Sequence, residues 1–221
     1  MKIATWNVFN GTSEQRSREL SDTDIIAFQE TDKTENSMSC VWTGDEGKRF
    51  KGVSVWSSRH RFSCLPHNPH CSPGLAVVFN DTPLGAIQIL NLWAKPKPDY
   101  CEDLINSLKS YREFILRAPT IVLGDFNISP KLSGKKRKFR NALSVLEHDF
   151  GLTSAYHHHF GDTFGEENHP THYHHRKEEK PFHIDFVFLP DALLARLNTV
   201  TVPDYSSYST SDHRPVICEF K

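Results

Sequence analysis

The sequence has no apolar run that approaches the roughly 18 residues needed to span a membrane, so we expect no transmembrane segment. Its start, MKIATWNVFNG, is interrupted by Thr5, Asn7 and Asn10 and does not predict a signal peptide. Twenty-six basic and 27 acidic side chains leave a formal net charge of −1, which excludes binding of nucleic acid by bulk positive charge. A local basic patch remains compatible with this balance, and we expect a cytoplasmic protein.

Cysteine is also sparse: there are five, an odd number, and none of them forms a C-x-x-C pair. This pattern predicts reduced thiols, with a Cys64–Cys71 bridge as the alternative. The 38% hydrophobic and 24% charged fractions are typical of an ordinary globular protein. A length of 221 residues predicts a single domain over residues 1–221.

Short strand-like runs dominate the chain. Apolar side chains recurring every three or four residues predict a helix over Tyr100–Leu116, with Asp99 as its N-cap, and a second helix over Phe139–His148. The remaining pattern predicts a mixed α/β domain. The expected strands are Lys2–Phe9, Ile25–Gln29, Gly52–Ser57, Leu75–Asn80, Gly85–Trp93, Thr120–Leu123, His183–Leu189, Asn198–Val202 and Pro215–Phe220.

Polar side chains lie in or directly beside five of these apolar runs. Each alone has a structural explanation, such as a turn cap or the first solvated residue after a strand, although an acid or amide inside a strand needs a partner. If the strand ends converge, these side chains form an oxygen-rich site that suits Mg²⁺ or Mn²⁺ and phosphoryl chemistry. The residues are Asn7, Glu30, Asp125, Asn127, Asp185, Asp212 and His213.

Five short motifs contain these residues: TWN (5–7), QE (29–30), GDFN (124–127), HID (183–185) and SDH (211–213). With them in this order, the sequence resembles the endonuclease/exonuclease/phosphatase superfamily of metal-dependent phosphodiesterases, from Thr5 to Pro215. The resemblance implies a four-layer α/β/β/α sandwich of two facing mixed sheets, the DNase I-like fold, with the site where the loops of the sheets meet.

The resemblance also implies how the cation and the attacking water are held. Glu30 is expected to be the principal ligand of Mg²⁺ or Mn²⁺, assisted by Asn7 and, through water, by Asp212. Asp125 is expected to orient and deprotonate the attacking water, and Asn127 to hold the phosphate or that water.

Three further residues complete the expected catalytic set. His213 is expected to donate a hydrogen bond to a phosphate oxygen, with Asp185 fixing its ring. Many relatives carry a Tyr or His late in the middle strand, where Asn91 is the expected occupant. Trp93 is interpreted as a core aromatic, with base stacking as the alternative.

The substrate is less directly encoded than the chemistry. Five of the six residues from 135 to 140 are basic, and Lys135, Lys136, Arg137 and Lys138 are candidates for contact with a nucleic-acid backbone, with a solvated loop as the alternative. The short chain leaves little room for insertions that would read a particular sequence. We expect a monomeric nuclease of low sequence selectivity, acting on DNA rather than RNA. An RNA-specific nuclease, or an enzyme for a small-molecule or lipid-head-group phosphate, is the alternative.

Histidine is the unusual component, since eight of the 13 lie between residues 157 and 183. Their position before the HID motif makes His172, Tyr173 and Arg176 candidate substrate contacts. A separate transition-metal site and a solvated polar loop are the alternatives, and the irregular spacing without cysteine counts against the metal site.

Overall fold

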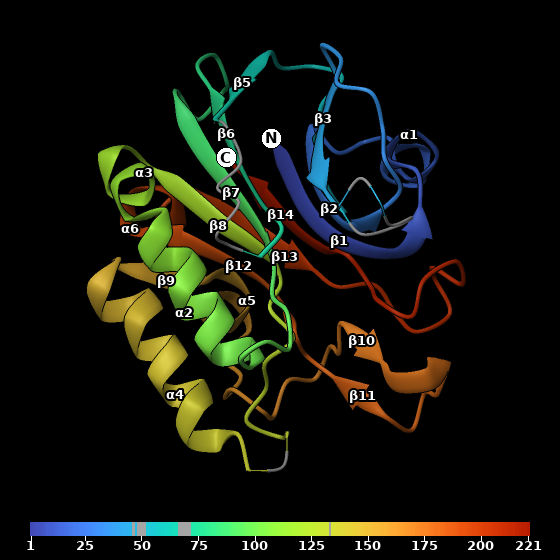
Figure 1. Ribbon diagram of the computed structural model, residues 1–221, viewed down its shortest axis with the longest axis vertical. Helices are drawn as coiled ribbons and strands as arrows, with labels where there is room; N and C mark the ends of the chain where they lie inside the picture. Colours follow the sequence, from blue (N-terminus) through green and yellow to red (C-terminus); the bar gives the residue numbers. More distant parts are fainter. Residues whose placement is uncertain (46, 48–51, 66–71, 133) are drawn as a thin grey trace.

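The computed structural model describes residues 1–45, 47, 52–65, 72–132 and 134–221. Two six-stranded sheets face each other (Figure 1). The first has the order β13-β14-β1-β2-β4-β3, formed by Leu197–Thr201, Val216–Phe220, Lys2–Gly11, Ile25–Thr31, Gly52–Trp56 and Cys40–Gly44. The second has the order β5-β6-β7-β8-β12-β9, formed by Phe62–Cys64, Gly74–Phe79, Ile87–Trp93, Thr120–Asp125, Asp185–Pro190 and Leu152–Ser154.

Each sheet combines parallel and antiparallel neighbours. In the first sheet β1 runs parallel to β2, with Asn7 beside Gln29, and in the second β7 runs parallel to β8. The β12 strand pairs antiparallel with β8 and places Asp185 directly opposite Asp125. Strands β6 and β7 pair antiparallel as a hairpin, with Phe79 opposite Ile87. These pairings bring the polar ends of four strands to one edge of the sandwich.

Hydrophobic side chains fill the space between the sheets and the space under the helices. The inner faces of both sheets form one core, which includes Ile3, Val55, Ile89 and Leu123. A second core joins β7, β8 and β12 to α2 (Tyr100–Ser110), α3 (Arg112–Arg117) and α4 (Lys136–Ser144), the helices that cover the outer face of the second sheet in Figure 1.

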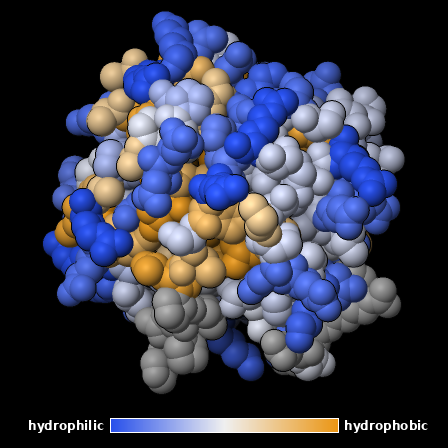
Figure 2. All heavy atoms as spheres, turned by 90° about the horizontal axis from the view of Figure 1, so that it is seen from above, coloured by the Kyte–Doolittle hydropathy of each residue, from blue (hydrophilic) through white to orange (hydrophobic). Residues whose placement is uncertain are grey.

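The outer face of the first sheet has a thinner cover. There Trp6 and Phe28 pack with Leu20, and the short α1 (Ser13–Ser17) and η1 (Arg18–Leu20) form the outer layer. The four-layer α/β/β/α sandwich is therefore confirmed, although one helical layer consists of single turns. Figure 2 shows the molecule from above, and on this face hydrophobic side chains are visible in one area bordered by hydrophilic ones.

The helices differ in detail from the sequence expectation. The run 100–116 breaks at Tyr111, whose φ of −101° and ψ of 16° separate α2 from α3. Asp99 is the N-cap, since its side chain accepts hydrogen bonds from the N–H groups of Cys101 and Glu102. The next helix begins three residues early, at Lys136, and a π-helical turn, η2 (Val145–Asp149), replaces its expected end.

Several short elements were not expected. Besides α1 and η1, they are the edge strands β3, β5 and β9, the two-residue hairpin β10 (His172–Tyr173) and β11 (Pro181–Phe182), α5 (Ala155–Phe160), η3 (His174–Arg176) and α6 (Asp191–Leu194). No helix in the described part of the chain is long and apolar enough to cross a membrane. Cys71 lies outside the described residues, and so does the alternative Cys64–Cys71 bridge.

Candidate active site

The first part of the site joins the two sheets through Asn7. Its side-chain nitrogen lies 3.2 Å from Oε1 of Glu30 and 2.9 Å from Oδ2 of Asp125, so one amide donates to a carboxylate of each sheet. Glu30 has a φ of 56° and interrupts the pairing of β2 with β4 between Gln29 and Thr31. This irregularity leaves the Glu30 side chain half-buried at the edge of the sandwich.

The GDFN turn holds Asp125 in place. Its Oδ1 accepts from the main-chain N–H of Asn127 at 3.0 Å, and its Oδ2 accepts from Nδ2 of Asn127 at 2.9 Å. The turn requires glycine at position 124, because φ is +138° and a Cβ there would lie 1.9 Å from the carbonyl oxygen of Leu92. Asp125 is therefore fixed by two amides, from Asn7 and Asn127, and is buried.

A buried carboxylate–histidine pair lies beside Asp125. Nδ1 of His213 is 2.9 Å from Oδ2 of Asp185, and Asp185 is fully buried. The side chain of Thr171 accepts hydrogen bonds from the N–H groups of Ile184 and Asp185, which fixes the start of β12. Burial by itself lowers the pKa of His213, but the charges of Asp185 and Asp125 outweigh it and raise that pKa to about 10. His213 is therefore protonated at neutral pH.

Asp125 has the opposite perturbation for a different reason. Burial, followed by repulsion from Asp185, raises its pKa to about 7, although His213 and the hydrogen bond from Asn7 lower it. A carboxylate with a pKa close to neutrality is suited to accept a proton at working pH. The pair of perturbed groups thus provides one acceptor and one donor side by side.

Strand β10 adds a second histidine to this edge. His172 of β10 pairs with His213 in an isolated bridge, and the two rings are 4.5 Å apart. Nε2 of His172 is 3.7 Å from Oδ2 of Asp212. Burial raises the pKa of Asp212, but His172 and His213 outweigh burial and lower it. Asp212 is therefore an anion between two imidazoles.

The donor atoms fit a hard divalent cation at this edge. The carboxylates of Glu30 and Asp212 are only partly buried, and Oδ1 of Asp212 has no hydrogen-bond partner among the described residues. Oxygen donors of this kind suit Mg²⁺ or Mn²⁺. Asn7 fits the expectation of a ligand less well, because its Oδ1 accepts from the N–H of Phe9 at 3.0 Å and its nitrogen faces the acids. Asn7 is placed as a clamp between Glu30 and Asp125.

Asn91 does not reach this edge, which corrects the expectation of a phosphate contact. It is fully buried, and its nitrogen donates to the main-chain oxygens of Phe28 and Ser54 at 3.0 Å each. Its Oδ1 accepts from Nε2 of Gln29 at 2.7 Å, so no hydrogen-bonding atom is directed at a substrate. Trp93, two residues further along β7, pairs with Asp125 and borders the cavity described next.

Two residues that sequence reasoning missed line the cavity beside Glu30. It measures about 390 Å³ and includes Lys95 and Tyr100 together with Asn127. Burial raises the pKa of Tyr100, and the negative charges of Asp125 and Glu30 raise it further, which places the phenol within their electrostatic reach. The sequence contained one usable signal, since Tyr100 directly follows the N-cap that we predicted for α2.

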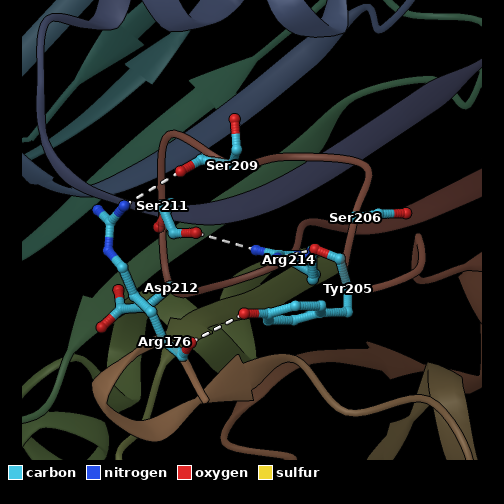
Figure 3. Close-up of a pocket in the computed structure, with 7 residues that line it drawn as sticks. All are labelled: Arg176, Tyr205, Ser206, Ser209, Ser211, Asp212 and Arg214. Atoms are coloured by element: carbon cyan, nitrogen blue, oxygen red, sulfur yellow. Dashed lines mark hydrogen bonds between the residues drawn. The ribbon is translucent and has the colours of Figure 1, made fainter. Parts of the chain in front are cut away.

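Arg176 and Tyr173 occupy different surroundings. Arg176 borders a cavity of about 240 Å³ together with Asp212, and its guanidinium donates to the carbonyl of Ser209 at 3.1 Å (Figure 3). Tyr173 is buried, with its ring 4.7 Å from that of Tyr205 and beneath the guanidinium of Arg214. Burial therefore corrects the expectation that Tyr173 contacts substrate, whereas Arg176 is accessible.

The basic segment lies next to the site rather than within it. Lys136, Arg137 and Lys138 form the first turn of α4, and Lys135 precedes them as its N-cap. The ammonium of Lys138 pairs with Asp99 and Glu102 at the start of α2. Its charge is thus partly neutralised by acids of the protein, whereas Lys135, Lys136 and Arg137 form no ion pair with another described residue.

The other histidines of the rich stretch divide into two groups. His157, His169 and His183 pack around Tyr156, whose hydroxyl lies 2.9 Å from Nδ1 of His169 and donates to Asp162 at 2.8 Å. His158, His159, His174 and His175 are exposed. Among the described residues, neither group places three metal-ligating side chains together, and the two clusters that do so both include His213.

Comparison with known proteins agrees with this geometry. The Endonuclease/Exonuclease/phosphatase family model matches residues 4–213. The chain belongs to this family. No curated protein sequence matches the chain.

Solved structures show the same fold at low identity. A 3′ phosphatase, NExo, from Neisseria, bound to a product DNA hairpin, is 22% identical with a TM-score of 0.72, over 100% of this chain and 99% of that chain. A 3′-5′ exonuclease, NExo, from Neisseria meningitidis is 22% identical with a TM-score of 0.71 over the same shares. An AP endonuclease from Archaeoglobus fulgidus is 18% identical with a TM-score of 0.71, again over 100% of this chain and 99% of that chain.

Proposed function

We propose that this protein is a divalent-metal-dependent nuclease that hydrolyses phosphodiester bonds of DNA with low sequence selectivity. The observation that carries the proposal is the position of Asp125, which is clamped by Asn7 and Asn127 and borders the buried Asp185–His213 pair. The folds of NExo and the archaeal AP endonuclease support nucleic acid as the substrate class. A cytoplasmic, monomeric enzyme with a preference for DNA over RNA stays a prediction.

The proposed reaction is an in-line attack of water on phosphorus. Asp125, with its pKa raised towards neutrality, accepts the proton of the attacking water, and Asn127 holds that water or the phosphate. Protonated His213 donates a hydrogen bond to a phosphoryl oxygen, with its ring fixed by Asp185. In this proposal Asp125, which accepts the proton, and His213, which donates a hydrogen bond to the phosphate, are neighbours before substrate binds.

The proposed cation is Mg²⁺ or Mn²⁺, held by Glu30 and by Asp212 through water, while Asn7 positions the Glu30 carboxylate. When bound, it offsets the negative charge that develops on the phosphoryl and leaving oxygens. Lys95 and Tyr100 face the same cavity as Glu30 and are placed to contact the phosphate that is cleaved.

Substrate contacts outside the centre are proposed for Arg176, His172, Lys135, Lys136 and Arg137. Arg176 and His172 flank Asp212, whereas the three basic residues lie at the start of α4. Lys138 is expected to contribute less to DNA binding than these three, because its ammonium already pairs with Asp99 and Glu102. A basic surface here would make DNA affinity fall steeply with salt.

A panel assay tests the proposal. Purified protein is incubated with Mg²⁺ or with EDTA on supercoiled plasmid, linear duplex, single-stranded DNA, an abasic duplex, RNA and inositol phosphates. We expect Mg²⁺-dependent cleavage of DNA, with Asp125→Asn at least ~10²-fold slower than wild type. The exposed Asp81→Asn is the matched control for removing one acid and should cleave like wild type. Activity confined to RNA or to inositol phosphates would replace DNA with the alternative substrate, and full activity in Asp125→Asn would remove the assigned base.

A further inference from the structure

A second type of ligand set lies at the edge of the candidate active site. One potential ligand atom from each of His172, Asp212 and His213 lies within 4.8 Å of the other two. The side chains of His172 and Asp212 are 14% and 13% exposed, so the cluster is accessible to a small ion but is largely enclosed. We propose that His172, Asp212 and His213 bind a transition-metal ion of the Zn²⁺ class, and that an ion held there withdraws His213 from phosphate binding.

The spacing of the ligands suits such an ion. Zn²⁺ lies about 2.0–2.1 Å from imidazole nitrogen and carboxylate oxygen, which puts two tetrahedral ligands roughly 3.4 Å apart. Nε2 of His172 and Oδ2 of Asp212 are already 3.7 Å apart, and the two imidazole rings are separated by 4.5 Å. All three ligand atoms lie within 4.8 Å of one another, on residues that the bridge between His172 and His213 already holds together.

The contact between His213 and Asp185 supports His213 as a ligand. Metal-bound histidine usually donates its other ring N–H to a carboxylate, which fixes the ring and makes the free nitrogen a better ligand. Nδ1 of His213 lies 2.9 Å from Oδ2 of the fully buried Asp185, so Nε2 is the nitrogen that an ion would take, with release of the proton that it carries at neutral pH. Oδ1 of Asp212 and Oδ1 of Asp185 have no hydrogen-bond partner among the described residues, so negative charge at the cluster is only partly compensated.

This cluster shares Asp212 with the proposed hard-cation site but differs from it in its two imidazole ligands. Imidazole suits Zn²⁺, Cu²⁺ and Ni²⁺, whereas Mg²⁺ favours oxygen ligands such as Glu30. An ion on Nε2 of His213 occupies the atom that is proposed to donate to phosphate. The inhibitory consequence rests on the proposed function, but the binding of the ion does not.

Binding is tested on the full-length protein without nucleic acid. Zn²⁺ affinity is measured by competition with a chromophoric chelator, and Co²⁺ replaces Zn²⁺ as a spectroscopic probe of coordination. We expect His172→Gln to weaken binding of the tightest ion at least about tenfold, because even loss of an outer-shell partner costs roughly 10- to 100-fold. His174→Gln is the matched control, because His174 lies two residues after His172, is exposed and lies outside the ligand cluster.

Inhibition is measured second, with each protein normalised to its own rate in Mg²⁺ alone. Zn²⁺ should inhibit the wild type and His174→Gln at the same concentration, and His172→Gln only at a concentration at least about tenfold higher. Equal Zn²⁺ affinity of wild type and His172→Gln, or equal loss in both variants, would overturn the site. If Zn²⁺ binds as expected and no DNA cleavage is seen under any condition, the metal site stands and the proposed nuclease function fails. Circular dichroism of each variant separates loss of a ligand from loss of the fold.

Discussion

Acid should destabilise this protein through His183, a residue that the proposed chemistry does not use. His183 is buried, with only 2% of its surface exposed. Its Nδ1 lies 2.9 Å from the carbonyl oxygen of His169, and its ring lies 4.4 Å from the ring of Tyr156. Burial lowers the pKa of His183 from 6.5 to about 4, against the raising effects of the His169 carbonyl and Glu167. The folded protein therefore keeps His183 neutral where the unfolded chain binds a proton.

The direction and size of the effect follow from this difference. Because the folded pKa is the lower one, the stability is complete above the unfolded pKa of 6.5 and is lost as the pH falls towards 4. A difference of about 2.5 pKa units corresponds to ~3 kcal/mol once both states are protonated. Between pH 8 and pH 5 the same two pKa values give a loss of about 2 kcal/mol. Against a typical stability of about 5–15 kcal/mol, this is measurable.

Urea unfolding followed by tryptophan fluorescence at pH 8 and pH 5 measures the effect, with EDTA present at both. The variant His183→Asn keeps a side-chain N–H near the His169 carbonyl but has no titratable ring. We expect wild type to lose about 2 kcal/mol more than His183→Asn between the two pH values, whatever the variant costs at pH 8. The subtraction removes the carboxylates, which titrate alike in both proteins. Losses that agree within ~0.5 kcal/mol would show that His183 is not held neutral by burial.

Three other substitutions test separate parts of the structure. Asn91→Leu should lower the free energy of unfolding by ~2–3 kcal/mol in urea titration, because two buried main-chain carbonyls lose their donor. Gly124→Ala should lower it by more than ~3 kcal/mol, since the added Cβ meets the Leu92 carbonyl oxygen at 1.9 Å and the φ of +138° is itself strained. Tyr100→Phe should lower kcat roughly tenfold with the fold intact, the size of one hydrogen bond to a charged group, whereas Tyr208→Phe, away from that cavity, should not.

The longer strands were predictable because their signal is local and continuous. Strands β1, β2, β7 and β8 are runs of buried residues with few interruptions, and the hairpin of β6 and β7 is marked by a short polar connection. The hairpin of β10 and β11 has two residues in each strand and is fixed by the bridge from His172 to His213, which a periodicity argument cannot detect. Likewise α5 reads AYHHHF, a segment without an apolar repeat, and folds as a helix through the packing of Tyr156.

Most of the candidate site was predictable because each of its residues ends or interrupts an apolar run. Asp125, Asp185 and His213 could be recognised for this reason, and the structure brings all three together. The local pattern does not distinguish the second histidine, His172, from its neighbours at 174 and 175, which are also histidines and are exposed. Its distinguishing property is a pairing across about 40 residues of chain, and that is a property of the fold.

The pleat of β7 explains why Asn91 does not contact phosphate as predicted, and the position of Asn91 shows how the site is supported. Residues two apart on a strand share a face, so Asn91 and Trp93 both point towards the first sheet, and only Trp93 lies level with Asp125. One step deeper, Asn91 bonds to Gln29, which also donates to Thr5 at 3.0 Å.

Two layers of polar side chains therefore cross the space between the sheets. The outer layer joins Asn7 to Glu30 and Asp125, and the buried layer beneath it joins Thr5, Gln29 and Asn91. The buried layer has no route to substrate, but it ties β7 to β2 and β4 through directional bonds that an apolar core lacks. The buried layer thus links the two sheets beneath the Asn7 clamp, so polar residues inside these strands support the site even where they cannot act in it.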